Sequence, residues 1–291
     1  MTARNTRSSK PAITALIDGD IFIYQAAAAS ERPIQWDEDL WTLHSSLSDA
    51  VQYFEDKLAS ALENIAQFHK AEVKPLIALS DPTGRYFRKD IWPAYKANRK
   101  TKRSPLVRRA LFDYVTEKYE TYTRPGLEGD DVLGILQTSP YIVKGEKVTV
   151  SSDKDFKTIP GNHYNMDREE FHTVSSASGA YFHMVQTLTG DSTDGYPGCP
   201  DIGPKTAEKL FAKTVETIPL GEESSLSPED VYAVLWPITV KAYERAGLSQ
   251  DYALTMARLA RICQRDDYDF KKKEVIPWTP PIPSITTPVL Q

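Results

Sequence analysis

Apolar residues along the first half of this chain fall into short runs separated by longer amphipathic stretches. Residues 37–71 carry apolar side chains at spacings of three and four, which predicts a helix, and helices are also expected over 21–30 and from about Leu127. The short runs predict strands over 12–17, 74–80, 119–123 and 146–152. Strands that alternate with helices predict an α/β fold around a central, mostly parallel, twisted sheet.

The second half of the chain has a different pattern. Residues 163–166 and 171–174 predict a late hairpin or a pair of edge strands, and residues 181–265 are expected to be helical apart from loops. Prolines crowd the segment from 277 onwards, which predicts an extended or disordered arm.

Composition indicates a globular protein of a reducing compartment. Hydrophobic residues make up 41% and charged residues 26% of the 291 positions, which are ordinary globular values. Two cysteines, Cys199 and Cys263, cannot build a disulfide framework. No apolar run reaches the roughly 18 residues that a membrane span needs. We therefore expect a cytoplasmic protein without a membrane partner.

Acidic residues gather where predicted strands end and predicted helices begin. Asp18, Asp81 and Asp153 each follow a strand, and the carboxyl ends of parallel strands meet at one edge of an open sheet. Glu128 and Asp131 are three positions apart, so a helix presents both on one face. Nearby stretches raise the number of candidate metal-binding carboxylates to nine: Asp18, Asp81, Glu128, Asp130, Asp131, Asp153, Asp155, Asp191 and Asp194.

A single aspartate at a helix start is ordinarily an N-cap or a solvated charge, and Asp20 is expected to be such a cap. Nine carboxylates this close together need a counter-charge, or some of them become protonated. Oxygen ligands select hard cations such as Mg²⁺ or Mn²⁺, and two such ions supply the chemistry of phosphodiester hydrolysis. The five histidines lack zinc-site spacing, and no Walker-type loop is present. We accordingly expect Asp131→Asn to stabilise the metal-free protein.

Residues 85–109 are strongly basic within an acidic chain. They carry ten lysines and arginines against one acidic residue, Asp90, with aromatic residues interleaved. Cations combined with stacking platforms favour single-stranded nucleic acid, although a solvated basic face is the alternative. The candidate DNA-binding residues of this segment are Arg85, Arg88, Tyr95, Lys100, Lys102 and Arg103.

A second candidate DNA contact is the turn that Gly198 and Gly203 flank. Pro204 suits the first position of a following helix, whose backbone N–H groups can hold a phosphate. Further side-chain contacts are expected from Lys205, Thr206 and Lys209.

Taken in order, the motifs "LIDGD", "SDP", "PAYKANRK", "LEGDD", "SSDKDF" and "GDSTDGYPGCPDIGPKTA" resemble the 5′-nuclease (flap endonuclease) family. The likeness covers residues 12–265 and is greatest to stand-alone bacteriophage 5′→3′ exonucleases. It implies a PIN-like, resolvase-like fold. The implied divisions are a flexible lead at 1–11, a nuclease domain at 12–185 with a helical arch at about 83–115, a helix–three-turn–helix region at 186–270 and a Pro-rich tail at 271–291.

The resemblance also implies roles for individual residues. Asp155, Asp191 and Asp194 would complete a second metal site that shares Asp153 with the first. Lys96 and Arg99 would be catalytic and steer the scissile phosphate, and Tyr95 would stack near the terminal base. The first metal site would comprise Asp18, Asp81, Glu128, Asp130, Asp131 and Asp153.

The implied activity is divalent-metal-dependent 5′→3′ exonuclease or flap endonuclease cleavage of DNA with 5′ single-stranded ends, flaps or nicks. The implied cofactors are two Mg²⁺ ions, replaceable by Mn²⁺, and a K⁺ ion at the 198–203 turn. A phage enzyme of this kind would act as a monomer in the host cytoplasm, in DNA replication, recombination or primer removal. Three matters stay open: exonuclease against flap endonuclease action, a non-catalytic branched-DNA binding protein, and a ribonuclease of the same fold that accepts RNA–DNA hybrids.

Overall fold

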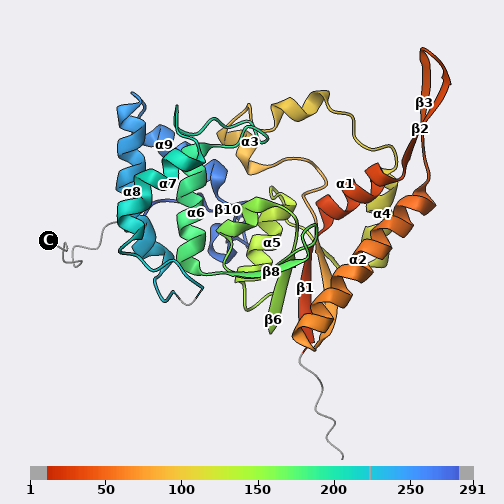
Figure 1. Ribbon diagram of the computed structural model, residues 1–291, viewed down its shortest axis with the longest axis horizontal. Helices are drawn as coiled ribbons and strands as arrows, with labels where there is room; N and C mark the ends of the chain where they lie inside the picture. The colour runs from red at the N-terminus through yellow and green to blue at the C-terminus, as the bar shows by residue number, and fades with distance from the viewer. Residues whose placement is uncertain (1–11, 223, 282–291) are drawn as a thin grey trace, which may run out of the picture.

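A six-stranded sheet occupies the middle of the molecule, a computed structural model that describes residues 12–222 and 224–281 (Figure 1). The strand order is β5–β4–β1–β6–β7–β8, and all neighbours are parallel except the antiparallel pair β7–β8. This confirms the mostly parallel α/β sheet and the late hairpin. The strands are β1 (Ala12–Asp18), β4 (Glu72–Ala78), β5 (Thr121–Tyr122), β6 (Glu146–Val150), β7 (Gly161–Asn165) and β8 (Glu170–Val174).

Helices cover both faces of the sheet because its strands are apolar on both sides. Ile13, Ala15 and Ile17 of β1 pack with α1 (Gly19–Ala29), α2 (Leu47–His69) and α4 (Arg108–Lys118). Leu16 points to the opposite face, where it packs with α5 (Gly129–Thr138). A sheet buried on both faces presents its functional groups at the ends of its strands.

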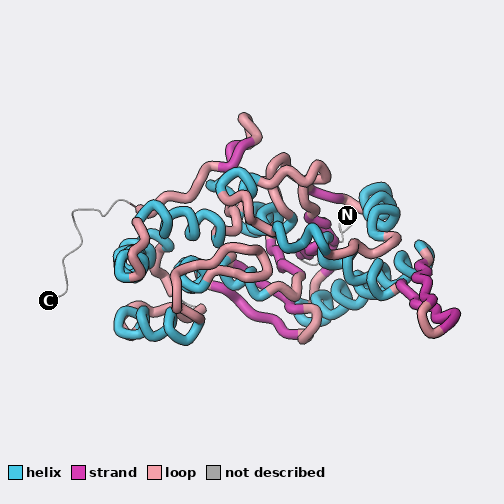
Figure 2. Tube along the Cα trace, turned by 90° about the horizontal axis from the view of Figure 1, so that it is seen from above, coloured by secondary structure: helices cyan, strands magenta, loops and turns pink. Residues whose placement is uncertain are grey.

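Residues 37–71 contain part of a hairpin and a helix, so the expected single helix is wrong. The strands β2 (Glu31–Asp37) and β3 (Leu40–Ser45) pair antiparallel, and α2 begins only after Ser46, whose hydroxyl accepts a hydrogen bond from Asp49 N. The hairpin extends away from the helices (Figures 1 and 2), and Trp36 and Trp41 are 65% and 57% exposed. The apolar spacing at the start of residues 37–71 therefore does not mark a face that packs in the core.

The C-terminal helices have an apolar core of their own. It is formed by α6 (Ser176–Thr189), α7 (Pro204–Val215), α8 (Pro228–Arg245) and α9 (Gln250–Ala260), with Phe211, Tyr243 and Met256 fully buried. The expected helical character of 181–265 is confirmed, although α6 begins earlier. A small hairpin that was not predicted follows, formed by β9 (Tyr268–Asp269) and β10 (Glu274–Val275).

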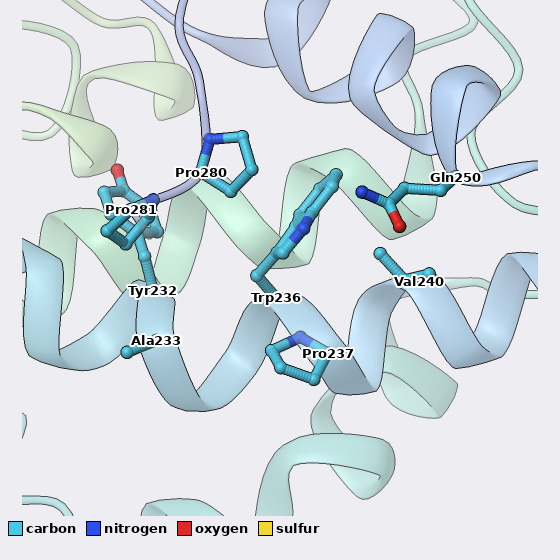
Figure 3. A pocket seen from close by; sticks show the side chains of 8 residues that line it. All are labelled: Tyr232, Ala233, Trp236, Pro237, Val240, Gln250, Pro280 and Pro281. Carbon is cyan, nitrogen blue, oxygen red and sulfur yellow. The ribbon is translucent and has the colours of Figure 1, made fainter. Parts of the chain in front are cut away.

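The beginning of the predicted Pro-rich arm packs on these helices. Trp278 is buried, and its ring lies edge-on to His183 and Trp236 at centroid distances of 5.1 and 5.4 Å. Pro280 and Pro281 then line a groove beside Trp236 (Figure 3). The predicted lead at 1–11 and the rest of the arm at 282–291 lie outside the described residues. Within the described ranges, no helix has the length and apolarity required to span a bilayer.

Candidate active site

The carboxyl edge of the sheet carries the strand-end aspartates. Asp18 is the last residue of β1, Asp81 follows β4, and Asp153 follows β6 just before the short helix η2 (Lys154–Thr158). Asp18 is 1% exposed, and its Oδ2 accepts a 2.6 Å hydrogen bond from Ser151 Oγ, next to the end of β6. The parallel topology therefore brings β1 and β6 carboxylates to one place.

Buried carboxylates raise one another's pKa at this edge. Burial raises the pKa of Asp18 to about 7, and the nearby charges of Asp20 and Asp153 contribute. Burial also raises the pKa of Asp130 well above its usual range, with Asp18 and Asp153 adding to the effect. The first group of candidate ligands is therefore short of positive charge.

A second group continues from the first through Asp153. Burial raises the pKa of Asp155 to about 6, and repulsion from Asp153, Asp191 and Asp194 adds to it, although Lys154 works in the opposite direction. The Asp191 Oδ1 also accepts a 2.7 Å hydrogen bond from Thr193 N, which fixes the loop between the two aspartates. The acidic cluster thus extends from β1 to the loop after α6.

Two cations of the basic segment reach into this cluster. Lys96 Nζ lies 2.5 Å from Glu128 Oε1 and 3.5 Å from Asp194 Oδ2. Arg99 Nη2, in the short helix η1 (Ala97–Thr101), lies 2.7 Å from Asp194 Oδ1. Burial acts to lower the pKa of Lys96, but Glu128 and Asp194 outweigh it and raise that pKa. Both residues expected to steer a phosphate therefore contact candidate metal ligands.

The loop 191–196 holds the basic segment in this position. Lys96 N donates to Asp194 O at 2.7 Å, and Asn98 Nδ2 donates to Ser192 O at 3.1 Å. Trp92 Nε1 donates to Gly195 O at 3.1 Å. These bonds keep Lys96 in the left-handed region, with φ of 54°, which costs a non-glycine residue about 1–2 kcal/mol.

Tyr95 lies inside the cluster rather than on its surface. Its side chain is 3% exposed, and its hydroxyl lies 2.8 Å from Glu128 Oε2 and 2.9 Å from Asp194 Oδ2. A single hydroxyl proton serves one carboxylate at a time. The contacts connect the two groups of carboxylates, and they do not support the expected stacking of this ring on a terminal base.

Asp131 and Arg88 form a buried ion pair. Both Asp131 oxygens receive 2.7 Å hydrogen bonds from Arg88, and Cys263 N donates to Oδ1 at 2.9 Å. Burial acts to raise the pKa of Asp131, but the charge and hydrogen bonds of Arg88 hold it below its usual range. Protein donors therefore satisfy Asp131, and the expectation that Asp131→Asn stabilises the metal-free protein is corrected. Arg88 is 3% exposed, so it does not present a DNA-contacting surface.

The positions of two other aspartates differ from expectation. Asp81 accepts hydrogen bonds from Gly126 N at 2.8 Å and Thr83 N at 2.9 Å, which directs it to the turn before α5. Asp20 is not the N-cap of α1, because that hydrogen bond from Ile21 goes to Asp18. Asp20 instead accepts from Ser80 N and lies at the edge of the cluster, where it contributes to the raised pKa of Asp18. The sequence signal that could have placed Asp20 at the cluster is its position two residues after Asp18, which ends a strand.

The second candidate DNA contact has the expected backbone. Gly198 has φ of 70°, and a Cβ there would meet Gly190 N at 2.3 Å, so a larger residue does not fit. Gly203 caps α7, and Pro204 occupies its first turn. Asp201 takes a left-handed φ of 59°, which favours glycine. The outward-facing cations and hydroxyl available here are Lys205, Thr206 and Lys209.

Other basic side chains of residues 85–109 differ in their exposure and in their ion pairs. Arg85 and Lys102 are exposed, whereas Arg103 is exposed and also pairs with Glu31 at 2.6 Å. The side chain of Lys100 lies outside the described part of the structure. Arg85 and Lys102 are therefore the clearest surface cations among the predicted DNA-binding residues of 85–109.

The donor set of the cluster fits a hard divalent cation. Across residues 12–222 and 224–281, no three histidine, cysteine, aspartate or glutamate side chains are placed so that they could hold one metal ion in this arrangement. The cluster nevertheless consists of oxygen donors, and burial raises the pKa of Asp18, Asp130 and Asp155. Carboxylates of this kind stay ionised near pH 7 when a cation neutralises them, and oxygen donors suit Mg²⁺ and Mn²⁺.

Comparison with known proteins places this geometry in context. The family model for the N-terminal resolvase-like domain of 5′–3′ exonucleases matches residues 14–181. An exodeoxyribonuclease of Enterobacteria phage T3 is 30% identical, with 91% of this chain and 92% of the relative covered. An exonuclease of Escherichia phage T7 is 31% identical, with 91% and 93% covered. The flap endonuclease Xni of Shewanella baltica OS185 is 27% identical, with 58% and 68% covered.

Proposed function

Because this chain belongs to the 5′–3′ exonuclease family, we propose that it is a divalent-metal-dependent nuclease that hydrolyses phosphodiester bonds near 5′ ends of DNA. The observation that carries the proposal is the cluster of buried and half-buried carboxylates at the sheet edge, with Lys96 and Arg99 held against it. The T3 exodeoxyribonuclease and T7 exonuclease support an exonuclease activity, and the Xni flap endonuclease supports action on flaps.

Two metal ions, Mg²⁺ or Mn²⁺, are proposed to bind this cluster. Asp18, Glu128, Asp130 and Asp153 would hold one, and Asp155, Asp191 and Asp194 would hold the other with Asp153 shared. Asp81 and Asp131 are left out because Asp81 is directed to the turn before α5 and Asp131 is paired with Arg88 through both of its oxygens. When bound, such ions lower the pKa of water and neutralise charge on the reacting phosphate.

The residues of the chain then orient and stabilise the DNA. Lys96 and Arg99 balance Glu128 and Asp194 in the present arrangement. Once those carboxylates have another counter-ion, the two cations are free to bind an incoming phosphate, where preorganised positive charge stabilises the transition state. The Tyr95 hydroxyl lies between Glu128 and Asp194 and donates its proton to one of them at a time.

Surfaces away from the cluster are proposed to bind the rest of the DNA. Arg85 and Lys102 would contact a 5′ single strand, and the N-terminus of α7 with Lys205 would bind a duplex phosphate. A K⁺ ion at the 198–203 turn would add to that contact. A role in phage DNA replication, recombination or primer removal is part of the proposal; the relatives from phages T3 and T7 are named an exodeoxyribonuclease and an exonuclease.

The test is cleavage of 5′-labelled blunt, nicked and flapped DNA with Mg²⁺, with EDTA as the zero point. Asp153→Ala should abolish cleavage while DNA affinity is retained, and Asp266→Ala, at an 81% exposed side chain, should cleave normally. Undiminished cleavage by Asp153→Ala would reject the proposed site.

The same assay separates the related activities. Mononucleotide release indicates exonuclease action, and release of the intact flap indicates endonuclease action. A matched substrate with a 5′ RNA strand on DNA tests whether hybrids are cleaved. Binding of all substrates by the wild-type protein without cleavage would identify a non-catalytic DNA-binding protein.

A further inference from the structure

Arg88 is the most deeply buried cation among the described side chains of the basic segment 85–109. It lies in α3 (Phe87–Ile91), and all five of its N–H groups have acceptors. Nη1 donates to Glu128 Oε2 at 3.1 Å, and both Nη atoms donate to Asp131 at 2.7 Å. The remaining donors reach two backbone oxygens at the end of α9, those of Leu259 at 3.0 Å and Arg261 at 2.5 Å.

These contacts connect the C-terminal helices to the start of α5. The last carbonyls of a helix lack partners within it, so the guanidinium satisfies groups that α9 leaves free. Asp131, at the third position of α5, also accepts from Cys263 N, just beyond α9. The Arg88–Asp131 pair therefore fixes the first turn of α5, where Glu128 is the N-cap, relative to the C-terminal region.

The two oxygens of Glu128 have different partners. Oε2 receives hydrogen bonds from Arg88 and Tyr95, at 3.1 and 2.8 Å, and faces the protein interior. Oε1 contacts Lys96, the cation at the acidic cluster. The first pair of bonds thus fixes the rotation of the carboxylate and directs Oε1 towards the cluster.

We infer that Arg88 is a positioning residue. It orients the Glu128 carboxylate so that Oε1 faces the proposed metal-binding cluster, and it makes that orientation depend on the position of the end of α9. The inference rests on the proposed function, since Glu128 is proposed there as a metal ligand. It replaces a DNA-contacting role, which a side chain with 3% exposure and no free N–H group does not support. Partners that orient a metal ligand affect metal affinity even though they do not touch the ion.

The test compares Mn²⁺ affinity with DNA affinity in Arg88→Lys, which keeps the charge but loses the planar fork. Calorimetry without DNA measures Mn²⁺ binding, and fluorescence anisotropy of a labelled 5′-flap substrate in EDTA measures DNA binding. We expect Mn²⁺ affinity to fall about 10–100-fold, as for partners of other metal ligands, and DNA affinity to change less than about twofold. Weaker DNA binding with unchanged Mn²⁺ affinity would overturn the inference.

A matched variant controls for general loosening of the C-terminal region. Arg261→Lys alters another buried arginine near α9, which pairs with Asp267 at 2.8 Å and does not contact Glu128 through its side chain. It should lose thermal stability but keep its Mn²⁺ affinity. An equal loss of Mn²⁺ affinity in Arg261→Lys would show that the loss comes from looser packing of the C-terminal region and not from a changed orientation of Glu128. That result would overturn the inference.

Tyr95→Phe removes the hydroxyl that contacts Glu128 and Asp194 without disturbing a buried charge. It removes the second hydrogen bond on Glu128 Oε2 and should lower Mn²⁺ affinity in the same direction as Arg88→Lys, by less. It remains decisive if Arg88→Lys does not fold: unchanged Mn²⁺ affinity in Tyr95→Phe then rejects the positioning of Glu128. A wild-type protein that binds Mn²⁺ but cleaves no substrate would reject the proposed function and leave this inference standing.

Discussion

Lys96 Nζ lies 2.5 Å from Glu128 Oε1, the oxygen that faces the acidic cluster. The lysine side chain is 12% exposed, so this ion pair is shielded from solvent. If Glu128 is a metal ligand, as proposed above, Lys96 takes the place of a metal ion in this arrangement. Metal binding would then require Lys96 to move away from Glu128.

Replacing this lysine should separate metal binding from cleavage. We expect Lys96→Met to tighten Mn²⁺ binding, because a competing cation is gone, and to slow cleavage by about 10²–10³-fold, because a preorganised charge is lost. Calorimetry and single-turnover cleavage measure the two effects. Lys89→Met, which loses an exposed lysine bonded to Gly84 O, is the control and should change neither. Weaker Mn²⁺ binding by Lys96→Met would contradict competition between Lys96 and the metal ion.

Adjacent aspartates at the start of α5 should respond oppositely to neutralisation. Asp131→Asn leaves the buried Arg88 without its main counter-ion and should lower the free energy of unfolding by about 3–5 kcal/mol. Asp130→Asn should raise it near pH 7 without metal, because burial and repulsion raise the pKa of Asp130. Urea denaturation in EDTA measures both. A shift of the same sign in the two variants would contradict this assignment of charges.

Buried histidines should make the protein acid-sensitive. Burial lowers the pKa of His163 to about 4 and that of His183 to about 3, from the usual 6.5. Below pH 6.5 these two histidines therefore bind protons in the unfolded chain but stay neutral in the folded protein. Their stabilising contribution is complete above pH 6.5 and is lost as the pH falls towards 4 and 3, by up to about 1.4 kcal/mol per pH unit for each histidine.

His163→Gln isolates one of these contributions, because an amide can replace the hydrogen bond between His163 Nε2 and Ile159 O. Urea denaturation of both proteins between pH 7.5 and 4.5 gives a difference curve. That difference removes the opposite effect of Asp18, whose pKa is raised and whose folded form gains stability as the pH falls. Parallel curves for wild type and variant would rule out a neutral buried His163.

Trp278 should stabilise the C-terminal helices although it lies in a Pro-rich segment. Its ring packs on His183, Tyr232 and Trp236, and Arg258 Nε donates to its carbonyl at 3.1 Å. We expect Trp278→Ala to cost about 3–5 kcal/mol, as for other buried aromatic side chains. Tyr141→Ala, at an 81% exposed ring, should stay within about 0.5 kcal/mol of wild type. Similar losses in both variants would show that Trp278 does not anchor the segment.

The sequence predicted the parts of the molecule that topology determines. Strand-end aspartates such as Asp18 and Asp153 could be anticipated, because a parallel sheet brings its carboxyl ends to one edge. Local patterns failed where a distant partner decides the outcome. Arg88 sits among exposed cations in the sequence, yet its counter-ion Asp131 is 43 residues away. The prediction for the hairpin β2–β3 was wrong for another reason, because the spacing of Leu40 and Leu43 suits a helix as well as a strand.

The same hairpin has a spectroscopic consequence. Of the five tryptophans, Trp36 and Trp41 are largely exposed on the hairpin β2–β3. The other three, Trp92, Trp236 and Trp278, pack in the C-terminal helical core. In the folded state, the exposed tryptophans therefore emit as indoles in water do. The change in emission on denaturation comes from the packed tryptophans, so it reports the C-terminal helices rather than the sheet. Circular dichroism follows both. Coincident fluorescence and dichroism curves would show that the sheet and the C-terminal helices unfold as one cooperative unit.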